Sequence, residues 1–174
     1  MALDLSEAPE GAGGWDGEHL HGCSGLPGMV GRGQRTEGLL KYLRCGKCAP
    51  RFRQGRRDDG IRVKRVPLRD DCRSDPDAMA GVVDDDTMMI VGSAPCFPHD
   101  VVDEILPLSR DAESADVWLH VYACVGGYLA PFAKGLGRDM PDFDFSIPGV
   151  RSLTAELHKF GVAPKQSSTD LYRS

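Results

Sequence analysis

Residues 87–121 decide the fold, and they read TMMIVGSAPCFPHDVVDEILPLSRDAESADVWLHV. Residues 87–91 and 117–121 are short, continuously apolar runs, a pattern typical of strands that are buried on both faces of a parallel sheet. Between them, residues 101–112 have the spacing of an amphipathic helix. A strand, a helix and a strand of these lengths predict a βαβ crossover, and therefore an α/β fold with a mainly parallel sheet.

The segments around this unit extend the pattern. Residues 61–68 alternate like a strand, and Pro76 behind an Asp or Ser cap predicts a helix over residues 77–83. Residues 128–136 predict a further helix, and residues 153–155 a short strand. Ligands of such sheets bind at the carboxyl ends of the strands. The loops that follow the two apolar strands, residues 93–99 and residues 122–127, are therefore the expected place for a site.

The first 59 residues have a different texture. They hold more than half of the 21 glycines and show little hydrophobic periodicity. Their best helical candidate is residues 36–44, and residues 51–57 form a basic run without core-forming side chains. We therefore expect two parts: residues 1–59 as a glycine-rich, poorly patterned segment of loop or disorder, and residues 60–174 as a partial domain.

Composition narrows the functional class. A formal net charge of -5 gives no electrostatic case for binding nucleic acid or a membrane surface. The chain starts without the features of a secretory signal and has no apolar run near the roughly 20 residues that span a bilayer. Its 6 cysteines lie at irregular spacings and are expected to be reduced thiols. We expect a soluble, cytoplasmic protein.

Four stretches in the second part carry a family resemblance. They are residues 66–73 (VPLRDDCR), 91–99 (VGSAPCFPH), 119–127 (LHVYACVGG) and 152–165 (SLTAELHKFGVAPK). In this order and at this spacing they resemble the pyridoxal-phosphate-dependent group II decarboxylase family, most closely its branch of sphingosine-1-phosphate lyases. The resemblance implies a fragment of a fold-type I transferase-like large domain, with pyridoxal 5'-phosphate as cofactor and no metal.

The resemblance also implies roles for individual residues. Lys159 would hold the cofactor through a Schiff base and is the catalytic candidate, with His158 near the cofactor phosphate. Tyr122, Ser93 and His99 fall on positions that line the cofactor. The implied reaction is cleavage of a carbon–carbon bond in a phosphorylated sphingoid base, or decarboxylation of an amino acid. The implied assembly is a homodimer with its sites at the subunit interface.

Several residues depart from the family pattern. Tyr122 stands where the family has an Asp that pairs with the pyridine nitrogen and keeps it protonated. Glu156 replaces an Asp and Leu157 a small polar residue. Asp100 and Gln166 replace glycines at turns where a positive φ is usual. These departures leave open that the chain is a catalytically inactive, truncated member of the family.

Two further family elements are weak or absent. The glycine-rich phosphate-binding turn has its nearest counterpart in residues 33–40, and the stretch with the ring-stacking His does not occur. Residues 47–57 can be encoded so that a reading frame shifted by one base gives that stretch, and we hypothesise that part of residues 1–59 is a frameshift product. The family's small C-terminal domain is not expected in a chain of this length.

A second alternative rests on the first part alone. His19, His21, Cys23, Cys45 and Cys48 include a Cys-x-x-Cys pair, which is a common half-site for zinc. A second well-spaced pair is missing, so a zinc-stabilised binding module remains the lesser interpretation. A metal assay on the purified protein tests it.

Overall fold

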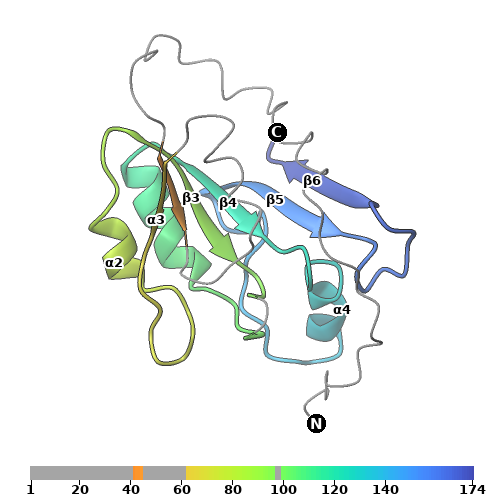
Figure 1. Cartoon of the computed structure of the whole chain (residues 1–174). Coiled ribbons are helices and arrows are strands. Elements are labelled where there is room, and N and C mark those ends of the chain that lie inside the picture. The colour runs from red at the N-terminus through yellow and green to blue at the C-terminus, as the bar shows by residue number, and fades with distance from the viewer. Residues whose placement is uncertain (1–40, 45–61, 97–98) are drawn as a thin grey trace. The chain divides into compact units, whose positions relative to one another are not determined.

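A computed structural model describes residues 41–44, 62–96 and 99–174, which lie within one compact unit, Arg35–Ser174 (Figure 1). Strands and helices alternate through this part of the chain. In chain order they are β1 Lys41–Arg44, β2 Arg62–Arg65, α2 Pro76–Ala80, β3 Thr87–Ser93, α3 Ile105–Ser114, β4 Trp118–Tyr122, α4 Ala130–Gly135, β5 Val150–Glu156 and β6 Ser168–Tyr172.

The strands form one sheet in the order β2-β1-β3-β4-β5-β6. All neighbouring pairs are parallel except β5 and β6, which are antiparallel. The expected α/β fold with a mainly parallel sheet is thus confirmed. The edge strand β6 was not expected from the sequence, because its residues STDLY are short, polar and mostly exposed, which matches no buried-strand pattern.

The helix expected over residues 36–44 is wrong where the structure describes it. Residues Lys41–Arg44 form β1, which pairs in parallel with β2 on one side and β3 on the other. Main-chain hydrogen bonds to two neighbours outweigh the weak helical spacing of the leucines, since local propensity is only a weak prior. Residues 36–40 lie outside the described residues, and the division of the chain at residue 59 stays a prediction.

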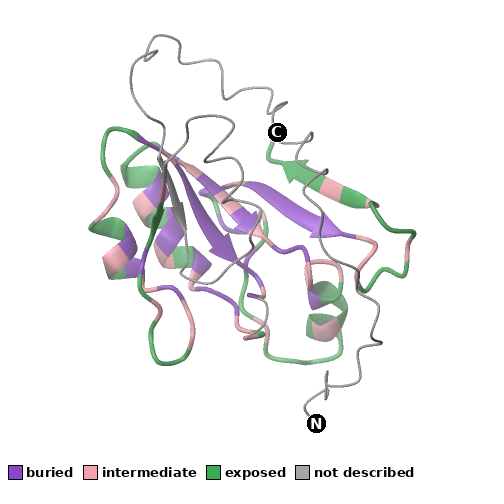
Figure 2. Ribbon diagram, in the orientation of Figure 1, coloured by how far each residue is buried: buried purple, intermediate pink, exposed green. Residues whose placement is uncertain are grey.

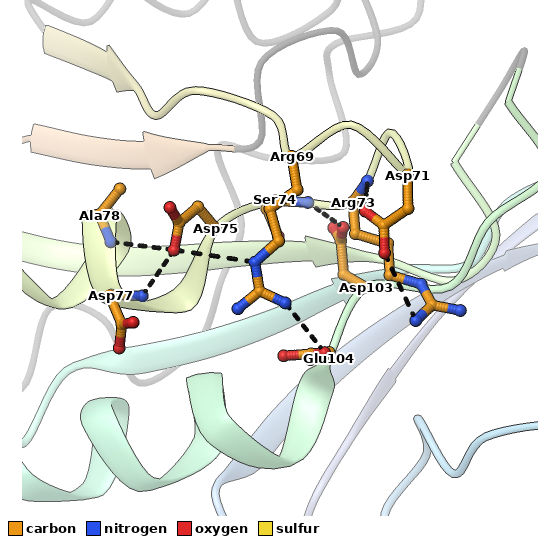
Figure 3. Close-up of polar contacts among 9 residues, drawn as sticks. All are labelled: Arg69, Asp71, Arg73, Ser74, Asp75, Asp77, Ala78, Asp103 and Glu104. Atoms are coloured by element: carbon orange, nitrogen blue, oxygen red, sulfur yellow. Dashed lines mark hydrogen bonds and ion pairs between the residues drawn. The ribbon is translucent and has the colours of Figure 1, made fainter.

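Helix α2 begins at a polar side-chain cap, whereas α3 and α4 have no side-chain cap hydrogen bond. Asp75 caps α2 by accepting hydrogen bonds from the backbone N–H of Asp77 (3.0 Å) and Ala78 (3.3 Å), with Pro76 in the first turn (Figure 3). Helix α3 begins at Ile105 rather than at residue 101, because Asp103 just before it is drawn into contacts of its own. Of the described helices, none is long and apolar enough to pass through a membrane.

The hydrophobic core lies between α3 and the sheet. Ile105 and Leu108 of α3 are fully buried against Ile90 of β3 and Leu119 of β4 (Figure 2). Gly92 permits this close packing, because a Cβ there would lie 2.6 Å from Cδ1 of Ile105. The continuously apolar character of residues 87–91 follows from this burial, and β3 carries its carboxyl end to the edge of the sheet where the candidate site lies.

Candidate functional site

The loops after β3 and β4 meet at the carboxyl edge of the sheet. Ser93 lies opposite Tyr122, and the N–H of Ala94 donates to the carbonyl of Tyr122 over 3.0 Å. Gly126 in the second loop packs on Pro95 in the first, where a Cβ would come within 2.4 Å of the proline ring. The expected juxtaposition of these two loops is therefore present.

The loop after β5 brings an amine to the same edge. Strand β5 pairs with β4 so that Thr154 lies opposite Tyr122, and β5 ends two residues later at Glu156, three residues before Lys159. The Lys159 side chain is 23% exposed, and its Nζ lies 3.8 Å from Oε2 of Glu156. Glu156 is the last residue of β5 and its side chain is 0% exposed. The lysine predicted to be catalytic is thus half-sheltered and paired with a buried carboxylate.

His158 completes this cluster. Its Nε2 lies 3.1 Å from the same Oε2 of Glu156, and its side chain is 13% exposed. On the other side of the ring, Nδ1 is 3.1 Å from the carbonyl oxygen of Ser167, which also accepts the backbone N–H of His158. A carbonyl oxygen only accepts, so Nδ1 carries a proton. The loop between β5 and β6 therefore holds the imidazole from both sides.

Tyr122 ends β4 on the polar face of the sheet. It lies in one row with Ser93 of β3, Thr154 of β5 and, one strand further, Asp170 of β6. Its phenol is partly buried. A phenol is a neutral donor and acceptor, so this position does not present the carboxylate that the family pattern requires there.

His120 lies one row below Tyr122 in a chain of hydrogen bonds. Trp118 Nε1 donates to Oγ of Ser152, and that oxygen lies 2.7 Å from Nδ1 of His120. His120 Nε2 lies 3.1 Å from Oγ1 of Thr154, which donates to Asp170 over 2.6 Å. The Thr154 hydroxyl donates its hydrogen to Asp170, so its oxygen can only accept a hydrogen bond from His120. Nε2 is therefore the ring nitrogen that carries hydrogen. Burial lowers the pKa of His120 to about 4, and the negative charge of Asp170 only partly opposes this.

Ser93 is held by a buried carboxylate. Asp103 is 1% exposed and accepts the backbone N–H of Ser93 over 2.8 Å. It also accepts the backbone N–H of Ser74 over 2.8 Å (Figure 3). The loop before α2 is thereby fixed to the loop after β3. Arg69 reinforces the junction through Glu104, at 3.1 Å. These contacts place Ser93 as part of the scaffold of the edge.

His99 lies in the loop after β3 and is half-buried. Its Nε2 is buried and makes no hydrogen bond to any described residue. Asp100 beside it has a φ of 54°, and Gln166 in the loop after β5 has a φ of 78°. The expectation that both positions adopt the left-handed conformation is confirmed, and both are strained because neither is glycine.

These residues fit pyridoxal phosphate in one respect and not in another. The amine of Lys159 fits the aldehyde of that cofactor, since a sheltered lysine is the group that forms such a bond. The imidazole of His158 contacts the carbonyl of Ser167 through Nδ1 and Glu156 through Nε2, so it does not hold out a free N–H to a phosphate. Tyr122 does not supply an acid for the ring nitrogen. Glu156, which the sequence marked only as a departure from the pattern, joins this cluster, and no local sequence signal predicts its contacts with Lys159 and His158.

Metal binding has no support in the part of the chain that the structure describes. Across residues 41–44, 62–96 and 99–174, no three His, Cys, Asp or Glu side chains gather as a metal site would need. The residues of the zinc interpretation, His19, His21, Cys23, Cys45 and Cys48, lie outside the described residues. The basic run and the frameshift hypothesis fall outside them too.

Comparison with known proteins finds relatives that share sequence with about two thirds of the chain. No family model matches the chain. It is 46% identical over 114 residues to a sphingosine-1-phosphate lyase of Arabidopsis thaliana, covering 66% of this chain and 21% of the relative. It is 40% identical over 116 residues to a probable L-tyrosine/L-aspartate decarboxylase of Methanocella arvoryzae, covering 66% and 30%. The chain thus spans between a fifth and a third of the length of these relatives.

Solved structures of related proteins have the same fold as this part of the chain. The sphingosine-1-phosphate lyase of Burkholderia pseudomallei superposes with a TM-score of 0.76 at 38% identity, covering 78% of this chain and 31% of that one. A rice TDC crystallised with PLP superposes with a TM-score of 0.61 at 15% identity, over 78% and 30%, which shows the fold alone. This part of the chain is therefore homologous to a segment of the sphingosine-1-phosphate lyases and is a fragment of the fold-type I, pyridoxal-phosphate-dependent group II decarboxylase fold.

Proposed function

We propose that the chain is a pyridoxal-phosphate-dependent carbon–carbon lyase of the sphingosine-1-phosphate lyase type, with Lys159 as the residue that binds the cofactor covalently. The observation that supports it is the cluster at the end of β5, where the Lys159 amine lies 3.8 Å from a buried carboxylate beside His158. A phosphorylated sphingoid base is the proposed substrate, with an amino acid as the alternative, and a homodimer is the proposed assembly.

The chain's own residues divide the work in this proposal. Lys159 supplies the amine. The family pattern places His158 near the cofactor phosphate, and its two ring nitrogens contact the carbonyl of Ser167 and the carboxylate of Glu156. Ser93 and His99 line the neighbouring loop after β3. The bound cofactor would supply the electron sink that accepts the charge of the broken carbon–carbon bond. Tyr122, on the same face, weakens that role because it brings no negative charge to the ring nitrogen.

A catalytically inactive member of the same family is the second candidate. Tyr122 is the observation that favours it, because a neutral phenol stands in the row where the family pattern has an acid. In this case cofactor binding through Lys159 persists without turnover. The two candidates differ in the fate of the substrate and not in the first covalent bond.

The test is a titration of the purified chain with pyridoxal phosphate, followed by borohydride reduction and peptide mapping. We expect a saturable visible absorbance band and a stable cofactor adduct on Lys159. Lys159→Ala should lose both. Lys165→Ala is the matched control, because Lys165 is an exposed lysine that follows in the same loop, and it should keep both.

The outcomes separate the candidates. An adduct on Lys159 with turnover of a phosphorylated sphingoid base supports the lyase. An adduct without turnover of that substrate or of amino acids supports the inactive member. Adducts spread over exposed lysines and retained in Lys159→Ala would contradict both, and zinc in the purified protein would then point to the metal-stabilised module.

A further inference from the structure

Glu156 contacts the two basic side chains His158 and Lys159 at the start of the loop after β5. Its Oε2 lies 3.1 Å from Nε2 of His158 and 3.8 Å from Nζ of Lys159, and its side chain is 0% exposed. Glu156 itself is fixed by the strand, because it pairs with Ser168 in the antiparallel ladder to β6. The carboxylate is therefore rigid, while the two basic side chains extend from a loop.

We propose that Glu156 is a positioning residue that holds the Lys159 amine in an ion pair and shares its charge with His158. The inference deepens the proposed function and rests on it for its biological meaning, since it concerns the amine that would bind the cofactor. The ion pair itself forms without the cofactor. A buried carboxylate needs a compensating partner, and these two basic groups provide it.

The geometry gives the pair a direct chemical consequence. An amine engaged in an ion pair with a carboxylate carries its proton and has no free electron pair for an electrophile. His158 competes for the same oxygen, with its Nδ1–H anchored on the carbonyl of Ser167. Glu156 therefore sets how available Lys159 is, and His158 limits how strongly Glu156 holds it.

The test measures the reactivity of Lys159 in the full chain without pyridoxal phosphate. The protein is labelled with a trace of acetic anhydride at pH 8, then unfolded and labelled completely with the isotopic form. Mass spectrometry of the peptides gives the extent of labelling at each lysine. Lys165 is the internal reference, because it is exposed and lies in the same loop. The ratio of Lys159 to Lys165 labelling is the readout, and it should be below one.

Substitution of the carboxylate should change this ratio in a defined way. Glu156→Gln keeps the size of the side chain and removes its charge, so we expect the ratio to rise about fivefold. Glu156→Asp restores the charge with a side chain one methylene shorter, and its ratio should stay within about twofold of the wild type. Glu113→Gln on the exposed side of α3 is the matched control and should leave the ratio unchanged.

A second variant reports even where Glu156→Gln does not fold. In His158→Asn the carboxylate no longer shares its charge with the imidazole, so the ratio should fall. A ratio that is unchanged in folded Glu156→Gln, or that fails to fall in His158→Asn, overturns the inference. Because no cofactor is present, these outcomes are distinct from failure of the proposed function, which is decided by the adduct on Lys159.

Discussion

The carboxyl ends of β4 and β5 are neighbours in one sheet, and they differ in whether they carry charged side chains. At the end of β5, Glu156, His158 and Lys159 form a cluster of one carboxylate and two basic groups. At the end of β4, Tyr122 places a phenol in the row between Ser93 and Thr154. The backbone ladder is continuous through both ends.

The difference shows that the scaffold and the chemistry of this edge are separable. The register of β4 depends on main-chain hydrogen bonds and on Leu119 and Val121, which are fully buried on the core side. The side chain at position 122 points to the opposite face, so its change from the family's acid leaves the ladder intact. The fold therefore records ancestry without guaranteeing activity.

Tyr122→Asp should have the largest effect, because it gives the end of β4 the acid that the family pattern has there. A charge-assisted hydrogen bond to the ring nitrogen is worth about 1.5–3 kcal/mol. We therefore expect pyridoxal phosphate to bind about tenfold to a hundredfold more tightly, as measured by absorbance titration. Tyr122→Asn has the same shape without the charge. Equal affinities of the two variants would mean that position 122 does not face the cofactor.

The second prediction concerns the network below Tyr122. His120 has a pKa of about 4 in the folded chain, lowered from 6.5 chiefly by burial. Between these values the unfolded chain binds a proton that the folded chain does not, so stability is complete above about pH 6.5 and falls as the pH drops toward 4. The loss is roughly 2 kcal/mol when the partial exposure of the ring is allowed for.

Urea unfolding at pH 7.5, 6, 5 and 4 measures this loss. His120→Asn is the reference variant, because it keeps a polar side chain in the network and removes the titrating group. The difference in unfolding free energy between the two proteins should shrink or reverse as the pH falls. A difference that is constant with pH would show that His120 titrates alike in the folded and unfolded chains.

Asp103 tests the scaffold that both strand ends share. Asp103→Asn removes the charge that accepts the N–H groups of Ser93 and Ser74, and turns one acceptor oxygen into an amide donor. We expect a loss of about 1.5 kcal/mol in unfolding free energy. Thermal unfolding monitors it, with Asp71→Asn at an exposed position of the neighbouring loop as control. Equal melting temperatures would contradict the role assigned to this carboxylate.

The smallest expected effects are gains in stability. Asp100 and Gln166 occupy left-handed backbone conformations, which cost an L-residue roughly 1 kcal/mol that glycine avoids. Part of this gain is lost to the greater freedom of glycine in the unfolded chain, so each of Asp100→Gly and Gln166→Gly should stabilise by about 0.5 kcal/mol. Denaturant titration resolves this for the double variant. Asp86→Gly, at an exposed turn position without a positive φ, should destabilise instead.

Sequence patterns predicted the buried part of the fold well and its polar margins poorly. The apolar runs of β3 and β4 and the Pro76 start of α2 were read correctly, because burial and proline geometry leave a local record. Strands β1 and β6 have no such local sequence signal, because Lys41–Arg44 has a helical spacing and Ser168–Tyr172 is polar. Each exists because a neighbouring strand supplies its hydrogen bonds, which is information from another part of the chain.

The candidate site divides in the same way. The sequence by itself determined the alternation of strands and helices from β2 to β5 and the two loops at the carboxyl edge, and the family motifs predicted Lys159 and His158 as site residues. Only the tertiary structure decided that Glu156 lies between these two basic groups, that His120 is locked to Asp170 across two strands, and that Asp103 anchors Ser93. The physical reason is that apolar periodicity is a local property of the chain, whereas a polar contact depends on the distance between side chains that the fold alone brings together.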